Sequence, residues 1–259
     1  MTLKAEYFKL NGQGIPSELL ERMVIPEHIS VKGHVLLPYV KSDLIPPDLD
    51  LILLEDLNGF YHRLNGDFFG FLSNFRGSYV TENSSWVPQR DYQKTNEALQ
   101  REYGISVTRA LLLPQERIDY WTMIHEALHG VFDYLPLEKR TRLVESVSSA
   151  YDTCGKLSNL LDLTHFRISN FGWDIDAVAR KMEENRVVKK PLFDGTEEFY
   201  TFQKLNPSDQ LQVVDEFISN FFANDRGKDR WSPKRLHPDF RATLREVGYN
   251  VDSPPEVMP

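Results

Sequence analysis

Residues 125–129, HEALH, constrain this chain more than any other stretch of its sequence. On a helix, His125 and His129 leave the same face one turn apart, because side chains four positions apart are neighbours there. Two imidazoles in that arrangement can bind one zinc ion through their nitrogens. Glu126 follows His125 directly, so its carboxylate can lie beside such an ion and deprotonate a water molecule without being a ligand. The motif therefore predicts a catalytic metal site.

The residues around the motif, 118–135, predict a helix. Large apolar residues recur there at helical spacing, namely Trp121, Ile124, Leu128, Phe132 and Leu135. Met123 and Ala127 make much of the remaining surface apolar, and Pro136 follows as a stop signal. We expect a buried helix that carries two polar rings.

Composition narrows the class of protein. A net charge of −8 argues against a nucleic-acid or anionic-membrane surface. Cys154 is the single cysteine, which excludes an intrachain disulfide and a cysteine-based zinc site. The first residues lack an apolar core of signal-peptide length, and no apolar run approaches membrane-spanning length. We expect a cytoplasmic protein, with export that needs no cleaved signal left open.

The rest of the chain predicts an α+β fold. We expect a small mixed or antiparallel sheet in the N-terminal half and a mainly helical C-terminal half that carries the 125–129 helix. Strands are predicted at 34–40, 49–54, 77–87 and 105–113. Further helices are predicted at 15–24, 95–103, 143–163, 175–188, 207–223 and 238–247. The aromatic-rich stretch 58–75 is interpreted as core filling beneath the sheet.

Residues 1–223 are expected to form one catalytic domain. Its halves are 1–104, which is rich in strands and aromatic residues, and 105–223, which holds the active-site helices. Residues 224–259 are expected to be a C-terminal extension whose last residues are disordered.

A catalytic zinc site normally has three protein ligands and an open position. The metzincin pattern, with Gly and His downstream of the second histidine, is excluded because Phe132 and Leu135 occupy those positions. Asp133 lies one turn past His129, but a helix cannot easily bend three consecutive turns onto one ion. We expect Asp133 to orient an imidazole or to stay at the surface.

A carboxylate from a later helix is the remaining source of the third ligand. Asp215 and Glu216 lie in the middle of the apolar helix 207–223, where a carboxylate requires a partner such as a metal. The longer arm of Glu216 and the small residues on its face favour it over Asp215. Three further acids stay open as alternatives, namely Glu145, Glu197 and Glu198.

With these residues the chain resembles a gluzincin-type zinc metallopeptidase, in residues 124–130 and more loosely in 215–223. It is similar in layout to small intracellular or phage- and mobile-element-associated metallopeptidases. The resemblance implies a zincin-like fold and one Zn²⁺ per chain, held by His125, His129 and Glu216. It also implies that a strand near the helix pairs with an extended substrate. Residues 105–113 and 77–87 are both candidates for that strand.

The expected function is hydrolysis of peptide bonds in a protein or peptide substrate, with Glu126 as the general base. The oxyanion donor stays open among four residues, namely Tyr151, His165, Tyr200 and His237. No nucleic-acid or membrane partner is expected, and the oligomeric state is left open. The alternatives are an inactive zincin-fold binding or regulatory protein, a metallohydrolase of a non-peptide substrate, and a metal-free interaction protein.

Overall fold

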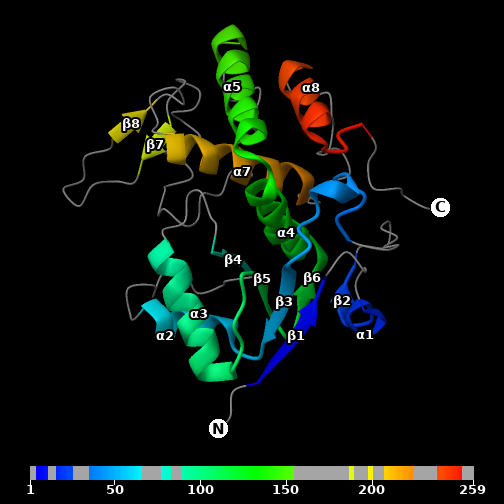
Figure 1. Cartoon of the computed structure of the whole chain (residues 1–259), viewed down its shortest axis with the longest axis vertical. Helices are drawn as coiled ribbons and strands as arrows, with labels where there is room; N and C mark the ends of the chain where they lie inside the picture. The colour runs from blue at the N-terminus through cyan, green and yellow to red at the C-terminus, as the bar shows by residue number, and fades with distance from the viewer. Residues whose placement is uncertain are drawn as a thin grey trace. The chain divides into compact units, whose positions relative to one another are not determined.

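The computed structural model (Figure 1) describes residues 4–10, 16–25, 35–65, 77–82, 89–154, 187–189, 198–200, 207–223 and 238–252. The chain divides into two compact units, Met1–Tyr134 with Ser253–Pro259 and Leu135–Asp252. Both units contain helices and strands, so the fold is mixed α+β with a small mixed sheet and several helices.

The first unit is built on a four-stranded sheet in the order β1-β3-β5-β4. Its strands are β1 (Ala5–Lys9), β3 (Leu49–Leu54), β5 (Arg109–Pro114) and β4 (Ser78–Thr81). The two central strands are parallel to each other, and each outer strand is antiparallel to its neighbour. The central strands are nearly continuous apolar runs, as expected for strands covered on both faces.

One face of this sheet packs against α2 (Leu57–Asn65) and α3 (Gln89–Tyr103), which lie side by side in Figure 1. Alternate residues of the strands point to this face. Together with the helices they bury one core cluster, which includes Ile52, Leu54, Phe60, Val80, Leu99, Ala110 and Leu112. Helix α3 ends where Gly104 adopts a φ of +72°, the left-handed conformation that ends many helices.

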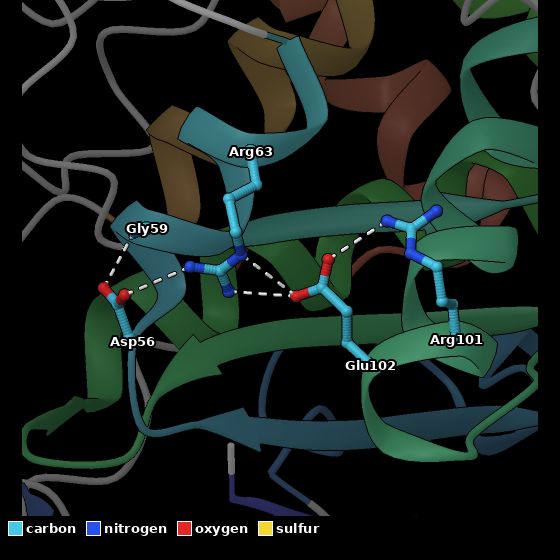
Figure 2. A network of polar contacts seen from close by, with 5 residues as sticks. All are labelled: Asp56, Gly59, Arg63, Arg101 and Glu102. Atoms are coloured by element: carbon cyan, nitrogen blue, oxygen red, sulfur yellow. Dashed lines mark hydrogen bonds and ion pairs between the residues drawn. The ribbon is translucent and has the colours of Figure 1, made fainter. Parts of the chain in front are cut away.

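Charged side chains link α2 to α3 at the surface (Figure 2). Arg63 on α2 donates to one oxygen of Glu102 on α3, at 3.2 Å from Nε and 2.9 Å from Nη2. Arg101 donates to the other oxygen of Glu102 at 3.1 Å. Asp56 accepts the Gly59 N–H at 2.8 Å in the first turn of α2 and lies 3.5 Å from Arg63.

The other face of the sheet packs against α4 (Tyr120–Tyr134). The helix follows β6 (Ile118–Asp119), which pairs in parallel with β2 (Met23–Val24) after the short helix α1 (Ser17–Leu20). A 3₁₀ turn η1 (Ser42–Leu44) precedes β3. The start of α4 is anchored by a 3.1 Å hydrogen bond between the buried hydroxyls of Tyr39 and Tyr120.

The second unit contains three helices among its described residues, α5 (Leu137–Cys154), α7 (Pro207–Ala223) and α8 (Pro238–Val247). Figure 1 shows α5 and α8 side by side. Two short strands, β7 (Val187–Lys189) and β8 (Glu198–Tyr200), form an antiparallel pair. Phe222 of α7 stacks on Tyr249, which follows α8, with ring centroids 5.7 Å apart. None of the described helices is long and apolar enough to cross a membrane.

The predicted helices 207–223 and 238–247 and the strand 49–54 are confirmed with these bounds. The predicted strand 34–40 is wrong, because residues 35–39 form turns. The strand predicted at 105–113 begins later, at Arg109, and runs to Pro114. The strand predicted at 77–87 is present as Ser78–Thr81, and residues 83–87 lie outside the described part of the chain. The predicted helix 118–135 begins two residues later than expected, since Ile118 and Asp119 pair with β2.

The helix predicted at 95–103 is confirmed within α3, which begins earlier, at Gln89. The helix predicted at 143–163 lies in α5 as far as Cys154, and its later residues lie outside the described part of the chain. The end of the helix predicted at 175–188 is wrong, because residues 187 and 188 belong to strand β7, and residues 175–186 lie outside the described part of the chain.

Other predicted elements are met in part. The helix predicted at 15–24 is a single turn, Ser17–Leu20, followed by strand β2. The aromatic stretch 58–75 falls largely in α2, with Phe60 in the core, and its residues beyond 65 lie outside the described part of the chain. Helix α8, predicted within the C-terminal extension, packs on α5 in the second unit. The single catalytic domain 1–223 stays a prediction.

Candidate metal centre

The two histidines of HEALH lie on consecutive turns of α4 and point toward one another. Their Nε2 atoms are 3.1 Å apart, and their rings are perpendicular. His129 is buried, with 4% of its surface exposed, and His125 is half-buried. In a hydrogen bond between these atoms, one imidazole donates its Nε2–H and the Nε2 of the other accepts it, so the two rings have different tautomers.

The local sequence accounts for the position of this pair. Ile124, Leu128 and Phe132 are buried on α4, which fixes the rotation of the helix about its own axis. The Asp119 carboxylate accepts the Thr122 N–H and its hydroxyl, both at 2.8 Å, and so caps the first turn. The helix that carries the imidazoles is therefore fixed along its length and at its start.

Glu126 is half-buried and lies against the chain entering β4. A Cβ atom at Gly77 would come within 3.2 Å of Glu126 Cγ, so glycine leaves the room that this side chain occupies. Ser78 hydrogen-bonds to the Tyr61 hydroxyl. Burial raises the pKa of Tyr61 above its ordinary value, the bond with Ser78 opposes that rise, and the Glu126 charge adds to it. The Glu126 charge therefore acts on Tyr61, whose hydroxyl bonds to Ser78 at the start of β4.

His129 lies against the sheet through Tyr79 of β4. The two rings stack with centroids 6.4 Å apart and planes inclined by 28°. The Tyr79 hydroxyl accepts a 3.0 Å hydrogen bond from Arg109 Nε. Burial raises the pKa of Tyr79, the charge of buried Asp133 adds to the rise, and the Arg109 charge opposes it. Asp133 was expected either to orient an imidazole or to stay at the surface. Its side chain is buried, so the second alternative is wrong.

The paired imidazoles fit a zinc ion as two of its ligands. Two Zn–N bonds of about 2.0–2.1 Å that meet at a tetrahedral angle place their nitrogens about 3.3–3.4 Å apart. The observed 3.1 Å between the Nε2 atoms is within a few tenths of an ångström of that separation. Neutral imidazole nitrogens are also the donors that zinc prefers in catalytic sites.

The candidates for a third ligand occupy different surroundings. Asp215 on α7 is fully buried, with 0% of its surface exposed, and its charge adds to the effect of burial in raising the pKa of Tyr249. Glu216 is the next residue of α7, and its side chain lies outside the described part of the structure. Glu145 is exposed on α5. Among the described residues, no cluster of three or more His, Cys, Asp or Glu side chains forms.

The other residues proposed for the site lie largely outside the described part of the structure. Glu198 and Tyr200 belong to β8 and Tyr151 to α5, and only their backbone is described. Glu197, His165 and His237 fall outside the described residues altogether. The choice among the oxyanion donors therefore stays a prediction.

Sequence reasoning missed two residues that contact the motif, Gly77 and Tyr79. Both belong to the predicted strand 77–87, and the only signal for them was that strand and its alternation of faces. Their contacts with Glu126 and His129 depend on the register of β4 against β5, in which Tyr79 lies opposite Leu111.

Comparison of the chain with models of protein families, with curated proteins and with solved structures finds no match in any of the three. The function is therefore inferred from the geometry of helix α4 and its surroundings.

Proposed function

We propose that this protein is a zinc-dependent metallopeptidase with a zincin-like fold, which hydrolyses peptide bonds in a protein substrate. One observation carries the proposal. The Nε2 atoms of His125 and His129 meet at 3.1 Å on a packed helix, and Glu126 lies beside them on the same turn. Chance occurrences of HEALH on a polar helix face or in a loop would not bring two imidazole nitrogens together against a buried sheet.

In this proposal His125, His129 and Glu216 hold one Zn²⁺. The two imidazole nitrogens fit the ion, as their separation indicates. Glu216 is preferred as the third ligand for the length of its side chain and the small residues on its helical face. Asp215 is the alternative, because it is the neighbouring carboxylate on α7 and is fully buried.

Zinc, when bound, polarises a carbonyl group and brings the pKa of a coordinated water toward 7. Glu126 accepts a proton from the attacking water at its carboxylate and later donates it to the nitrogen of the leaving amine. The half-buried position of Glu126 supports this role, because a partly exposed carboxylate can be reached by water from solvent.

Strand β4 supports the proposal that the substrate is an extended polypeptide. Among the described residues, β5 is interior to the four-stranded sheet, whereas β4 is an edge strand of it. Its outer N–H and C=O groups can pair with an added strand, the mode by which extended peptides bind sheet edges. Tyr79 and Gly77 place this edge beside His129 and Glu126.

The first test is the zinc content of purified protein by elemental analysis. We expect one equivalent in the wild type, and loss of it in His129→Ala and in either Glu216→Ala or Asp215→Ala. Glu126→Gln is the matched control, because it removes the base but neither imidazole and should keep its zinc. A wild type that contains no zinc, and binds none when Zn²⁺ is supplied, would refute the proposal.

The second test is hydrolysis of unfolded casein and of a mixed peptide library, followed by mass spectrometry. Wild-type protein loaded with zinc should generate new peptide termini that Glu126→Gln does not generate. Equal zinc in both proteins with no cleavage by the wild type would indicate the inactive binding protein or a non-peptide substrate instead.

A further inference from the structure

A buried cation lies on the sheet face beneath α4. Arg109 of β5 has only 5% of its surface exposed. Its guanidinium forms an ion pair with Asp48, donates to the Tyr79 hydroxyl and lies 5.6 Å from the centre of the Tyr134 ring. Burying a charge is costly unless it is paired, and each of these contacts offsets part of that cost. The guanidinium is therefore fixed in position by groups on three sides.

Arg109 in turn fixes the ring of Tyr79. Tyr79 lies opposite Leu111 on the neighbouring strand, so Arg109 is its diagonal neighbour on the same face of the sheet. The 3.0 Å bond from Arg109 Nε holds the hydroxyl end of the phenol. The opposite end is attached to the backbone of β4. A ring held at both ends has little freedom to change rotamer.

Helix α4 is shaped to accept this ring. A Cβ atom at Gly130 would come within 3.3 Å of Tyr79 Cε2 and 3.4 Å of Leu49 Cδ1. Glycine at this position lets the phenol approach the helix directly beside His129. The His129 imidazole then stacks on the phenol, with ring centroids 6.4 Å apart and planes inclined by 28°.

We propose that Tyr79 is a positioning residue for His129, held in place by Arg109, and that this brace sets the zinc affinity of the site. The inference rests on the proposed function in naming zinc as the ligand. Its physical basis is that metal affinity depends on how well the ligands are oriented before the ion binds. Tyr79 keeps His129 Nε2 directed toward His125 Nε2, which lies 3.1 Å away.

The test measures the dissociation constant for Zn²⁺ by competition with a chromophoric chelator. Tyr79→Leu removes the ring and is expected to weaken zinc binding about tenfold or more. Tyr79→Phe keeps the ring but loses the bond to Arg109, so it should weaken binding by a smaller factor. Arg109→Met should resemble Tyr79→Phe.

Tyr92→Phe is the matched control. Tyr92 on α3 donates a 2.7 Å hydrogen bond to the Val107 carbonyl, away from α4, so its removal costs a comparable bond without touching His129. Its zinc affinity should stay within a factor of two of the wild type. Unchanged affinity in Tyr79→Leu, or an equal loss in Tyr92→Phe, would overturn the inference.

A second readout separates this inference from the proposed function. Two-bond ¹H–¹⁵N spectra of the metal-free protein report the tautomer and environment of each imidazole, and His129→Gln assigns the His129 signal. We expect Tyr79→Leu to shift or broaden that signal while Tyr92→Phe leaves it unchanged. If the wild type binds no zinc, the proposed function fails, and the spectra still decide whether Tyr79 positions His129. An unperturbed His129 signal in Tyr79→Leu would refute the brace.

Discussion

Gly77 packs closely against Glu126, and a larger residue at position 77 would crowd the side chains between β4 and α4. A Cβ atom there would be 2.7 Å from Leu113 Cδ2, 2.7 Å from Thr122 Cγ2 and 3.2 Å from Glu126 Cγ. We therefore predict that Gly77→Ala lowers the free energy of unfolding by about 1–3 kcal/mol, the usual cost of overpacking. Urea unfolding of the metal-free protein measures this change.

A double-mutant cycle identifies the cause of that loss. Thr122→Ser removes the methyl group that the new Cβ would meet and keeps the hydroxyl that donates to Asp119. Gly77→Ala should cost less in the Thr122→Ser background than in the wild type, because the two changes share one contact. Equal costs in both backgrounds would show that the Gly77–Thr122 contact does not limit the size of residue 77.

The fold was predictable where the local sequence alone shows the apolar pattern of a strand or a helix. The strand 49–54 is a run of apolar residues, and the helices 207–223 and 238–247 combine apolar periodicity with proline at their first position. Residues 34–40 carry a similar apolar run, but residues 35–39 form turns instead. Tyr39 in this stretch hydrogen-bonds to Tyr120, which lies 81 positions away in the chain. The local sequence cannot predict such a distant contact.

The residues of the candidate site also differ in whether the local sequence predicts them. The His125 and His129 pair follows from a spacing of four residues on one helix, which the sequence states directly. Glu216 and Asp215 are separated from that pair by a long stretch of chain, so the sequence supplies only a ranking of buried acids. Tyr79 and Gly77 were not predictable as site residues, because strand register decides what they contact.

Asp119 should stabilise the metal-binding helix as its N-terminal cap. Its carboxylate accepts two 2.8 Å hydrogen bonds from Thr122, one of them from a backbone N–H that the helix itself cannot satisfy. We predict that Asp119→Ala lowers the free energy of unfolding by about 1 kcal/mol. Asp119→Asn is the control, since asparagine caps helices about as well. A loss of equal size in Asp119→Asn would mean that charge, and not capping, is responsible.

The ion pair between Arg63 and Glu102 (Figure 2) should contribute modestly and in a salt-dependent manner. It joins α2 to α3, but 39% of the Arg63 side chain is exposed, which weakens the attraction through solvent screening. We predict that Arg63→Met costs about 0.5–1 kcal/mol at low salt and less in about 1 M NaCl.

Arg101→Met is the control for that measurement. Arg101 binds the same carboxylate, but it lies on the same helix as Glu102 and is more exposed, at 66%. Arg101→Met should therefore lower the free energy of unfolding by less than Arg63→Met does at every salt concentration. Urea unfolding at two ionic strengths measures both. If Arg101→Met lowers the free energy of unfolding as much as Arg63→Met does, joining the two helices adds nothing to the stabilisation.

Asp252 should make the stability of the second unit depend on acid pH. Its carboxylate accepts bonds from Arg245 at 2.6 and 2.8 Å and from Arg241 at 2.5 and 3.2 Å. These arginines, Arg245 first, lower the pKa of Asp252 from 3.8 to about 2. A carboxyl group whose pKa is lower in the folded state stabilises that state above the unfolded pKa, and the effect fades as the pH falls toward the folded pKa.

We therefore predict that Asp252→Asn lowers the free energy of unfolding at pH 7, and that its difference from the wild type shrinks as the pH falls from about 4 toward 2. Urea unfolding measured across that range tests the sign. Glu97→Gln, which changes an exposed acid on α3 in the first unit, is the control for a general effect of charge removal. A difference between Asp252→Asn and wild type that stays constant or grows as the pH falls would contradict the role assigned to the two arginines, because protonation of Asp252 must remove the attraction that they supply.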